Sequence, residues 1–314
     1  AMTTRHSLVA LAVGAAIVAA TGAAEAQQVR LMTGPQGGSW YPLGGAIANI
    51  AANDGINVQV LPGAGIANVR AIAEDKADIG FANSISTVDG VNGRPPFESV
   101  QENVCNVGTL YPQYFQIVVN ADSGIESVED AKGQAIAIQP KGNTAEAISA
   151  QLFEVFGMTY DDMDQVSFVS YTDAVSLMKD NNAQMFTLGT TVPASAVMDL
   201  ASARDIKLLE IPDDKFEAMR ELNPGYAKLT IPAGSYPGQD EDVDVIGYAT
   251  HVIARCDLDP DVVYNILSGM VNDKADLVAI AKAMDNTTLE VMASDTGVPM
   301  HEGATRFYEE HGAL

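Results

Sequence analysis

Short strand-like runs and helix-period runs alternate along this sequence, and a polar or glycine-rich turn separates the members of each pair. Residues 29–33 form the first strand-like run, and the turn at residues 34–39 contains three glycines. Apolar residues then recur at Leu43, Ile47 and Ile50, a spacing that places them on one face of a helix. Strand, turn and helix in this order predict parallel strands joined by right-handed crossovers, with a ligand crevice at the carboxyl ends of the strands.

The same order of elements recurs in two series. Further strands are predicted at residues 56–61, 78–82, 135–139, 166–169, 185–188 and 245–254. Two helices are expected after the last strand, with buried faces at Val263, Leu267 and Met270 and at Leu277, Ile280 and Met284. A length of 314 residues exceeds the usual size of a single core, which favours two lobes.

These patterns predict an α/β protein with two lobes. Lobe I is expected to comprise residues 27–118 plus 240–314, and lobe II residues 119–239. Because the last elements return to lobe I, two or more strands should cross between the lobes and form a hinge. A hydrophobic content of 47% supplies a substantial core, which argues against disorder for the bulk of the chain.

The first 26 residues have the pattern of a secretory signal peptide. Arg5 and His6 begin it, an apolar run covers residues 8–20, and Ala24-Glu25-Ala26 provides a small-x-small cleavage site. The run is too short to span a bilayer, and no caps or polar face support the alternative of a core helix. The first cysteine, Cys105, lies far from the cleavage site, so no lipid anchor is expected. The sequence predicts a mature protein that is soluble in the bacterial periplasm.

The net charge is strongly negative. Lys and Arg number 17 against 41 Asp and Glu, a formal charge of −24 at pH 7. Removal of the signal peptide takes away Arg5 and Glu25 and leaves this charge unchanged. Such a field repels phosphate backbones and anionic lipids, which argues against nucleic-acid binding and adsorption to membranes. Two explanations of the acidic charge remain open: a surface adapted to saline surroundings, or simply a secreted protein of low isoelectric point.

Few residues offer catalytic or metal chemistry. No zinc-type spacing of His and Cys occurs, no Gly-x-Ser-x-Gly elbow is present, and residues 63–68 lack the third glycine of a dinucleotide fingerprint. We therefore expect no cofactor, no metal and no catalytic residue. Cys105 and Cys256 are the two cysteines; an oxidising compartment favours their pairing, and two buried thiols remain the alternative.

Four turns place backbone N–H groups and small polar side chains where a strand precedes a helical pattern. They are residues 37–39, 83–84, 142–144 and 189–191. Unsatisfied N–H groups and the positive end of the helix dipole make helix starts favourable for carboxylates. One such turn is more often an ordinary N-cap, but four of them in two lobes predict a small polar anion held between the lobes. Trp40 is expected to add a wall and Tyr41 a hydrogen bond, with buried aromatic packing as the alternative.

Four segments, in order, carry a family resemblance. They are residues 33–44 (TGPQGGSWYPLG), 77–84 (ADIGFANS), 231–238 (IPAGSYPG) and 299–304 (PMHEGA). Together they resemble the TAXI family of TRAP-transporter solute receptors. The resemblance implies a periplasmic-binding-protein type II fold, in which each lobe is a mostly parallel sheet flanked by helices. It also implies a receptor that delivers glutamate, a related dicarboxylate or a 2-oxoacid to sodium-driven permease subunits in the membrane, without an ATPase.

The resemblance assigns ligand-binding roles to residues of the four turns. These residues are Gly38, Ser39, Trp40, Tyr41, Asn83, Ser84, Asn143, Thr144, Thr190 and Thr191. Trp40 replaces the tyrosine usual in the family, and Lys141 and Asn143 occupy positions where small residues are common. Lys141 is a candidate cationic partner for a second carboxylate, with a solvated surface lysine as the alternative. His301, in the last motif, is expected to be structural.

Two other functions remain open at this level. A periplasmic enzyme on the same scaffold would need a base, for which Lys141 and His251 are the candidates, and a nucleophile beside it. A receptor that signals to a sensor protein without supporting transport is the third hypothesis. The hydroxyl-rich turns have no evident base partner, which favours the binding protein.

Overall fold

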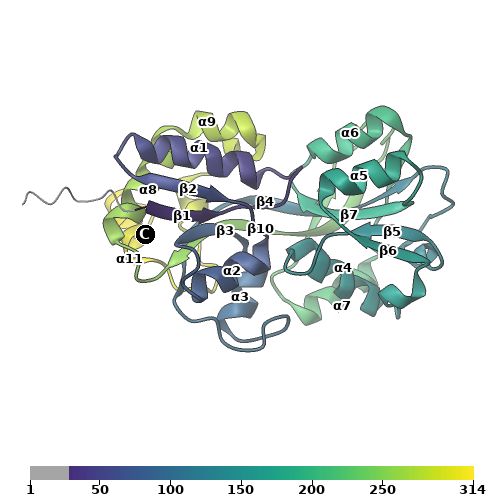
Figure 1. Cartoon of the computed structure of the whole chain (residues 1–314), viewed down its shortest axis with the longest axis horizontal. Coiled ribbons are helices and arrows are strands. Elements are labelled where there is room, and N and C mark those ends of the chain that lie inside the picture. Colours follow the sequence, from purple (N-terminus) through teal and green to yellow (C-terminus); the bar gives the residue numbers. More distant parts are fainter. Residues whose placement is uncertain (1–27) are drawn as a thin grey trace, which may run out of the picture.

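The computed structural model of the chain describes residues 28–314, and the expected signal peptide at residues 1–26 lies outside this range. The strands within the range belong to one sheet (Figure 1). They are β1 (Gln28–Met32), β2 (Asn57–Leu61), β3 (Ile79–Asn83), β4 (Val104–Asn120), β5 (Ala135–Ile138), β6 (Gln165–Phe168), β7 (Met185–Thr190), β8 (Ile206–Leu208), β9 (Ala227–Ile231) and β10 (Val243–Arg255).

Helices connect the strands and cover both faces of the sheet (Figure 1). They are α1 (Trp40–Ala52), α2 (Gly65–Ala73), α3 (Ser84–Val91), α4 (Thr144–Val155), α5 (Tyr171–Lys179), α6 (Ser195–Ala203), α7 (Asp213–Leu222), α8 (Pro260–Asn272), α9 (Lys274–Ile280), α10 (Leu289–Met292) and α11 (Glu302–Glu310). Short 3₁₀ turns lie at Val128–Ala131, Tyr160–Asp162 and Lys282–Asn286.

The order of the strands divides the sheet into two lobes. It is β2-β1-β3-β10-β4-β7-β5-β6, with β8 paired to β4 and β9 to β10. In lobe I, β1 runs parallel to β2 and β3, and in lobe II, β5 runs parallel to β6 and β7. The long antiparallel strands β4 and β10 pass from one lobe into the other (Figure 1). The two-lobed α/β architecture predicted from the sequence is confirmed.

The crossing strands change partners at their middles. Residues 104–109 and 112–114 of β4 pair with β10, and residues 114–119 pair with β7 of lobe II. Between the two paired stretches with β10, next to the pair Pro112 and Ala249, the register shifts. Because proline donates no hydrogen bond and a register shift disrupts the ladder, pairing is weakest at the crossing. The strands therefore cross between the lobes near Pro112 and Ala249.

Each lobe buries apolar side chains on both faces of its part of the sheet. In lobe I, one core lies under α1, α8 and α11, and another under α2. In lobe II, one core lies under α4 and α7, and another under α5 and α6. The helix faces predicted at Leu43, Ile47 and Ile50 and at Val263, Leu267 and Met270 are buried, whereas Ile280 of the third predicted face is 38% exposed.

Several elements differ from those predicted. The strands β4, β8 and β9 and the helix α7 were not predicted from the sequence. The helix expected to include Met284 ends at Ile280, and Met284 lies in a 3₁₀ turn. Gly189 and Thr190 belong to β7, and α6 begins only at Ser195. A residue before proline avoids the helical region, so the helix cannot start before the Val192-Pro193 pair.

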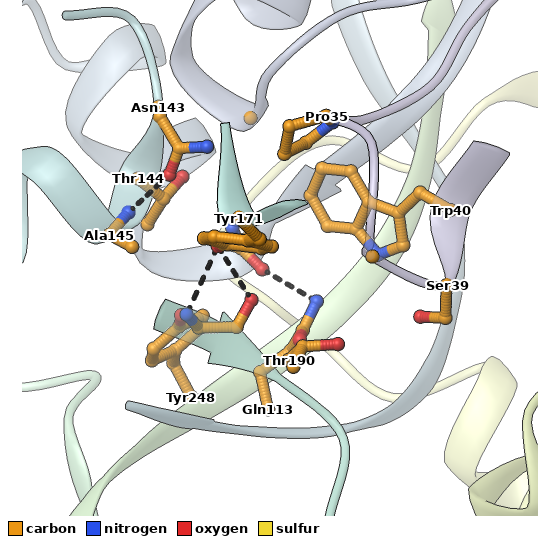
Figure 2. Close-up of a pocket in the computed structure, with 14 residues that line it drawn as sticks. Pro35, Ser39, Trp40, Gln113, Asn143, Thr144, Ala145, Tyr171, Thr190 and Tyr248 are labelled. Carbon is orange, nitrogen blue, oxygen red and sulfur yellow. Dashed lines mark hydrogen bonds between the residues drawn. The ribbon is translucent and has the colours of Figure 1, made fainter. Parts of the chain in front are cut away.

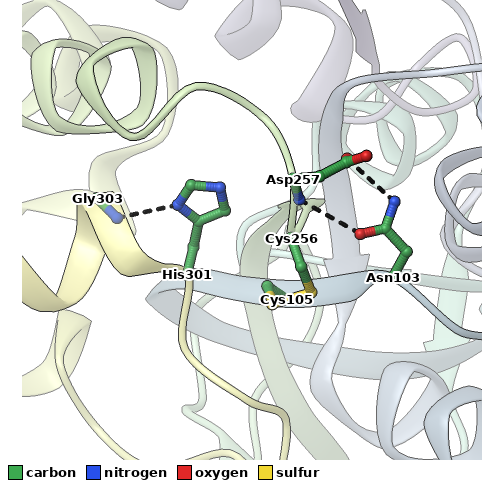
Figure 3. Close-up of a disulfide and its surroundings, with 6 residues drawn as sticks. All are labelled: Asn103, Cys105, Cys256, Asp257, His301 and Gly303. Atoms are coloured by element: carbon green, nitrogen blue, oxygen red, sulfur yellow. Dashed lines mark hydrogen bonds between the residues drawn. A yellow bond between two sulfur atoms is a disulfide. The ribbon is translucent and has the colours of Figure 1, made fainter.

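Cys105 and Cys256 form a disulfide at the lobe I ends of β4 and β10 (Figure 3). Their Cα atoms are 5.0 Å apart. Nearby, His301 caps α11, and its Nδ1 accepts a hydrogen bond from the N–H of Gly303 at 3.0 Å. This is the structural role expected for the histidine. Within residues 28–314, no helix is long and apolar enough to cross a membrane.

Candidate functional site

A cavity lies between the lobes, above the crossing strands β4 and β10 (Figure 2). Its empty space is about 350 Å³, mouth included. Both lobes and both crossing strands contribute to its wall. The lining residues are Pro35, Gly38, Ser39, Trp40, Gly65, Asn83, Gln113, Asn143, Thr144, Ala145, Tyr171, Gly189, Thr190 and Tyr248.

The cavity brings all four predicted turns together. The expected ligand-binding residues that line it are Gly38, Ser39, Trp40, Asn83, Asn143, Thr144 and Thr190. Three of the turns reach it at the starts of α1, α3 and α4, and the fourth reaches it at the end of β7. Parallel strands joined by crossovers present their carboxyl ends at one edge, which explains this convergence.

Four other expected residues lie outside the cavity wall. Tyr41 is 49% exposed, because the helix turns it away from the face that carries Trp40. Ser84 lines a different hollow, and the backbone carbonyl of Thr191 accepts a hydrogen bond from a β4 side chain at 3.4 Å. Lys141 is exposed to solvent and supplies no cation to the cavity.

Half of the residues that line the cavity are not among the expected ligand-binding residues. The additional residues are Pro35, Gly65, Gln113, Ala145, Tyr171, Gly189 and Tyr248. Gln113 and Tyr248 face each other across β4 and β10, at the floor of the cavity. No sequence signal distinguishes them, because the strand around Gln113 contains other polar residues, such as Asn106 and Gln116, and Tyr248 lies in an apolar strand.

The side chains at two of the helix starts turn away from their own helices. Ser39 precedes α1, but its Oγ lies 3.1 Å from the hydroxyl of Tyr111. Asn83 precedes α3, and its Oδ1 accepts a hydrogen bond from Gln113 Nε2 at 3.4 Å. Asn143, by contrast, caps α4 through a hydrogen bond of 2.8 Å. The first turn of α1 therefore keeps N–H groups that its own cap does not use.

Two aromatic side chains reach the cavity from opposite lobes (Figure 2). Trp40 stacks on Phe81 with ring centroids 5.6 Å apart. The hydroxyl of Tyr171 accepts a hydrogen bond from the N–H of Gly189 at 3.1 Å and donates to its carbonyl at 3.3 Å. Burial raises the pKa of Tyr171 to about 12, so the phenol stays neutral. These rings give the cavity two apolar walls.

Hydrogen bonds join the lobes beside the cavity. The N–H groups of Ile66 and Ala67, at the start of α2, donate to the carbonyl of Gly142 at 3.1 and 3.0 Å. The hydroxyls of Ser86 and Thr144 lie 3.2 Å apart. These contacts link lobe I to the turn that begins α4, so the structure is a closed form of the two lobes.

The cavity is uncharged. Among the residues that the structure describes, no Asp, Glu, Lys, Arg or His lines it, and no group of acidic, His or Cys side chains is arranged to hold a metal. His251 is fully buried inside lobe I, with Nε2 2.6 Å from Thr87 Oγ1 and Nδ1 3.0 Å from Asn106 Oδ1. Burial lowers its pKa to about 3. Both bases considered for an enzyme, Lys141 and His251, therefore lie outside the cavity.

Two α/β lobes joined by crossing strands around a closed polar cavity define the fold of the periplasmic solute-binding proteins. The sequence profile of the NMT1-like family matches residues 31–312, and the chain belongs to that family.

Solved structures agree with this fold at low sequence identity. A protein of Bordetella bronchiseptica RB50 has a TM-score of 0.56 and 14% identity, with 91% of this chain and 98% of that chain covered. An ancestral arginine-binding protein bound to arginine has a TM-score of 0.50 and 15% identity, with 81% and 96% covered.

Proposed function

We propose that this chain is the extracytoplasmic solute receptor of a TRAP transporter, which captures a small carboxylate between its lobes and delivers it to sodium-driven permease subunits. The observation that carries the proposal is the composition of the cavity wall. Turns from both lobes converge on it with N–H and O–H donors, and no acidic side chain of the described range faces it. Donors fixed by the fold stabilise a carboxylate without a cationic side chain.

Three further observations support the proposal. The motifs at residues 33–44, 77–84, 231–238 and 299–304 resemble those of TAXI receptors, and the chain belongs to the NMT1-like family. The disulfide fits an oxidising compartment such as the periplasm. The signal-peptide pattern of residues 1–26 fits export to the same place.

The geometry suggests how capture proceeds. The open lobes take up the anion on donors of lobe I, and rotation about the crossing at Pro112 and Ala249 brings the donors of lobe II onto it. Closure removes water from the anion, which strengthens its hydrogen bonds. The closed shape is then the form that the permease recognises.

Calorimetry of the mature chain, residues 27–314, tests the ligand class. The panel contains glutamate, 2-oxoglutarate, succinate, pyruvate and lactate, with uncharged glycerol as the control. At least one carboxylate should bind with a dissociation constant in the micromolar range or below, and the control should not. Recovery of the bound acid unchanged by mass spectrometry would separate a receptor from an enzyme. If none of the carboxylates binds, the proposal is wrong.

Uptake by membrane vesicles tests the coupling to a permease. Vesicles that contain TRAP permease subunits matched to this receptor should accumulate the bound acid only when the receptor and an inward sodium gradient are present. Collapse of the gradient should stop uptake, whereas depletion of ATP should not. Dependence on ATP would identify a different transporter class, and binding without any uptake would favour a receptor coupled to a sensor.

A further inference from the structure

Three buried polar atoms in the cavity wall have no hydrogen-bond partner among residues 28–314. They are Trp40 Nε1, Gln113 Oε1 and Tyr248 Oη. Their residues are only 7%, 2% and 3% exposed, respectively. Buried polar groups in folded proteins are nearly always paired, because an unpaired group loses its bonds to water without compensation. Three such atoms around one cavity indicate that a bound ligand forms the hydrogen bonds that they lack.

The chemistry of the three atoms is complementary. The indole Nε1–H of Trp40 is a donor only. The amide of Gln113 donates through its Nε2 to Asn83 Oδ1 at 3.4 Å, which leaves its Oε1, an acceptor, without a partner. The hydroxyl of Tyr248 both donates and accepts, and burial raises its pKa, which keeps its proton in place. A ligand that matches them must bring an acceptor and a donor of its own.

The positions of the three atoms indicate where the ligand's acceptor and where its donor would lie. Trp40 begins α1, so its indole lies beside the helix start that attracts an anion. Gln113 and Tyr248 are paired residues of β4 and β10, at the floor between the lobes. The Tyr248 hydroxyl occupies the space beside Gly189, where a Cβ would lie only 1.9 Å from it. The absence of a side chain at Gly189 of lobe II therefore leaves the space that the Tyr248 hydroxyl fills.

The absence of charge in the wall excludes some ligands. The N–H donors at the helix starts serve one carboxylate, and a second would add a like charge to the same wall without a cation, because Lys141 is exposed outside the cavity. An ammonium group would be buried without a carboxylate, since no Asp or Glu within residues 28–314 lines the cavity. Burial of an unpaired charge is strongly unfavourable. The donor that Gln113 Oε1 needs is therefore a neutral one, and a hydroxyl supplies both that donor and an acceptor for Tyr248 Oη.

We propose that the ligand is a small hydroxylated monocarboxylate, that is, a hydroxy acid. Its carboxylate accepts hydrogen bonds from Trp40 Nε1 and the helix starts. Its hydroxyl donates to Gln113 Oε1 and accepts from Tyr248 Oη. This inference rests on the proposed function and narrows its ligand class away from dicarboxylates, amino acids and 2-oxoacids.

Two matched sets of acids test the inference by calorimetry on the mature chain. The first set is lactate, propionate, pyruvate and alanine, and the second is 2-hydroxyisovalerate, isovalerate, 2-oxoisovalerate and valine; succinate and glutamate are added to both. In at least one set, the hydroxy acid should bind ten times more tightly than every analogue of equal carbon number. A site built to pair a hydroxyl discriminates strongly against ligands that lack it.

The outcomes distinguish this inference from the proposed function. Tighter binding of an oxoacid, an amino acid or a dicarboxylate overturns the hydroxy-acid assignment and leaves a carboxylate receptor. An oxoacid would mean that Gln113 turns its Nε2 toward the cavity instead of its Oε1. Binding of no carboxylate in either set overturns both.

A substitution identifies the residue responsible. Gln113→Met keeps the length of the side chain and removes the acceptor. It should weaken binding of the hydroxy acid at least tenfold and change the dissociation constant of its deoxy analogue less than twofold. Thr250→Val is the matched control, because Thr250 Oγ1 is also buried and unpartnered in the described range but does not line the cavity. The control should bind both acids as the native chain does. Equal losses for the two acids in Gln113→Met would contradict the assigned role.

Discussion

At the scale of single residues, His251 is a buried imidazole whose environment sets the pH dependence of stability. Its two ring nitrogens form hydrogen bonds within lobe I, one with Thr87 and one with Asn106. Burial lowers the pKa of the imidazole from 6.5 to about 3. The unfolded chain therefore binds a proton between pH 6.5 and 3 that the folded chain does not. The stabilisation is fully present above pH 6.5 and is lost as the pH falls, at about 1.4 kcal/mol per pH unit.

His251→Gln removes this titration. Denaturant unfolding at pH 7.0, 6.0, 5.0 and 4.0 should show the free energy of unfolding falling more steeply with acidity in the native chain than in the variant. The difference between the two curves should grow from pH 6.5 downward, because carboxylates that titrate in both proteins cancel. Parallel curves would mean that His251 takes up a proton in the folded state as readily as in the unfolded one.

The sequence identified the residues of the turns better than those of the strands. Ser39, Asn83, Thr144 and their neighbours stand out because glycine and small polar residues interrupt the apolar pattern. Gln113 and Tyr248 do not, since both lie inside long strands that are buried along most of their length. The direction of a side chain could not be predicted from the sequence either, and Lys141, which is exposed to solvent, is an example. A cation near a predicted site in sequence says nothing about whether its ammonium group faces the ligand.

At the scale of elements, the starts of α2 and α4 meet across the lobes. A Cβ at Gly65 would lie 2.3 Å from Thr144 Oγ1 and 3.0 Å from Asn83 Nδ2. Gly65→Ala should therefore keep the lobes from closing fully and weaken ligand binding at least tenfold. The fold itself should be little affected, because alanine is favourable in a helix. Calorimetry for affinity and thermal unfolding for stability measure the two effects separately.

Gly45→Ala is the matched control for this experiment. Gly45 lies in α1, and a Cβ there would meet no atom within 4 Å. Affinity should be unchanged, and stability should rise by up to about 1 kcal/mol from helix propensity. If Gly65→Ala binds the ligand as tightly as the control does, the contact between the two helix starts does not limit closure.

Element prediction succeeded where period and turn chemistry agreed, and failed where a strand crosses between lobes. The units β1–α1, β2–α2 and β5–α4 follow the pattern of a strand, a turn and an amphipathic helix. The strand β4 is long, contains Pro112 and is buried on both faces, so it shows neither alternation nor a bounding glycine. Its identity depends on pairing with β10, which is more than a hundred residues away along the chain.

At the scale of the whole molecule, the crossing strands are the connection that both closure and stability depend on. The disulfide ties their lobe I ends together and closes a loop of 151 residues that contains all of lobe II. In the chain-entropy model, such a loop stabilises the folded state by about 5 kcal/mol. The sequence alone left the pairing open, because only the fold brings residues so distant in sequence next to each other.

The double substitution Cys105→Ser and Cys256→Ser should lower the unfolding temperature strongly and leave ligand affinity unchanged. Affinity is preserved because Cys105 lies about 25 Å along β4 from Gln113, given the rise of a strand. Thermal unfolding and calorimetry of the folded variant measure the two quantities, and native protein treated with a reductant should reproduce the variant. A variant that stays folded at the assay temperature but binds its ligand more than tenfold more weakly would mean that the disulfide also holds the floor of the cavity, and that the lobe I ends of β4 and β10 set the geometry of the crossing.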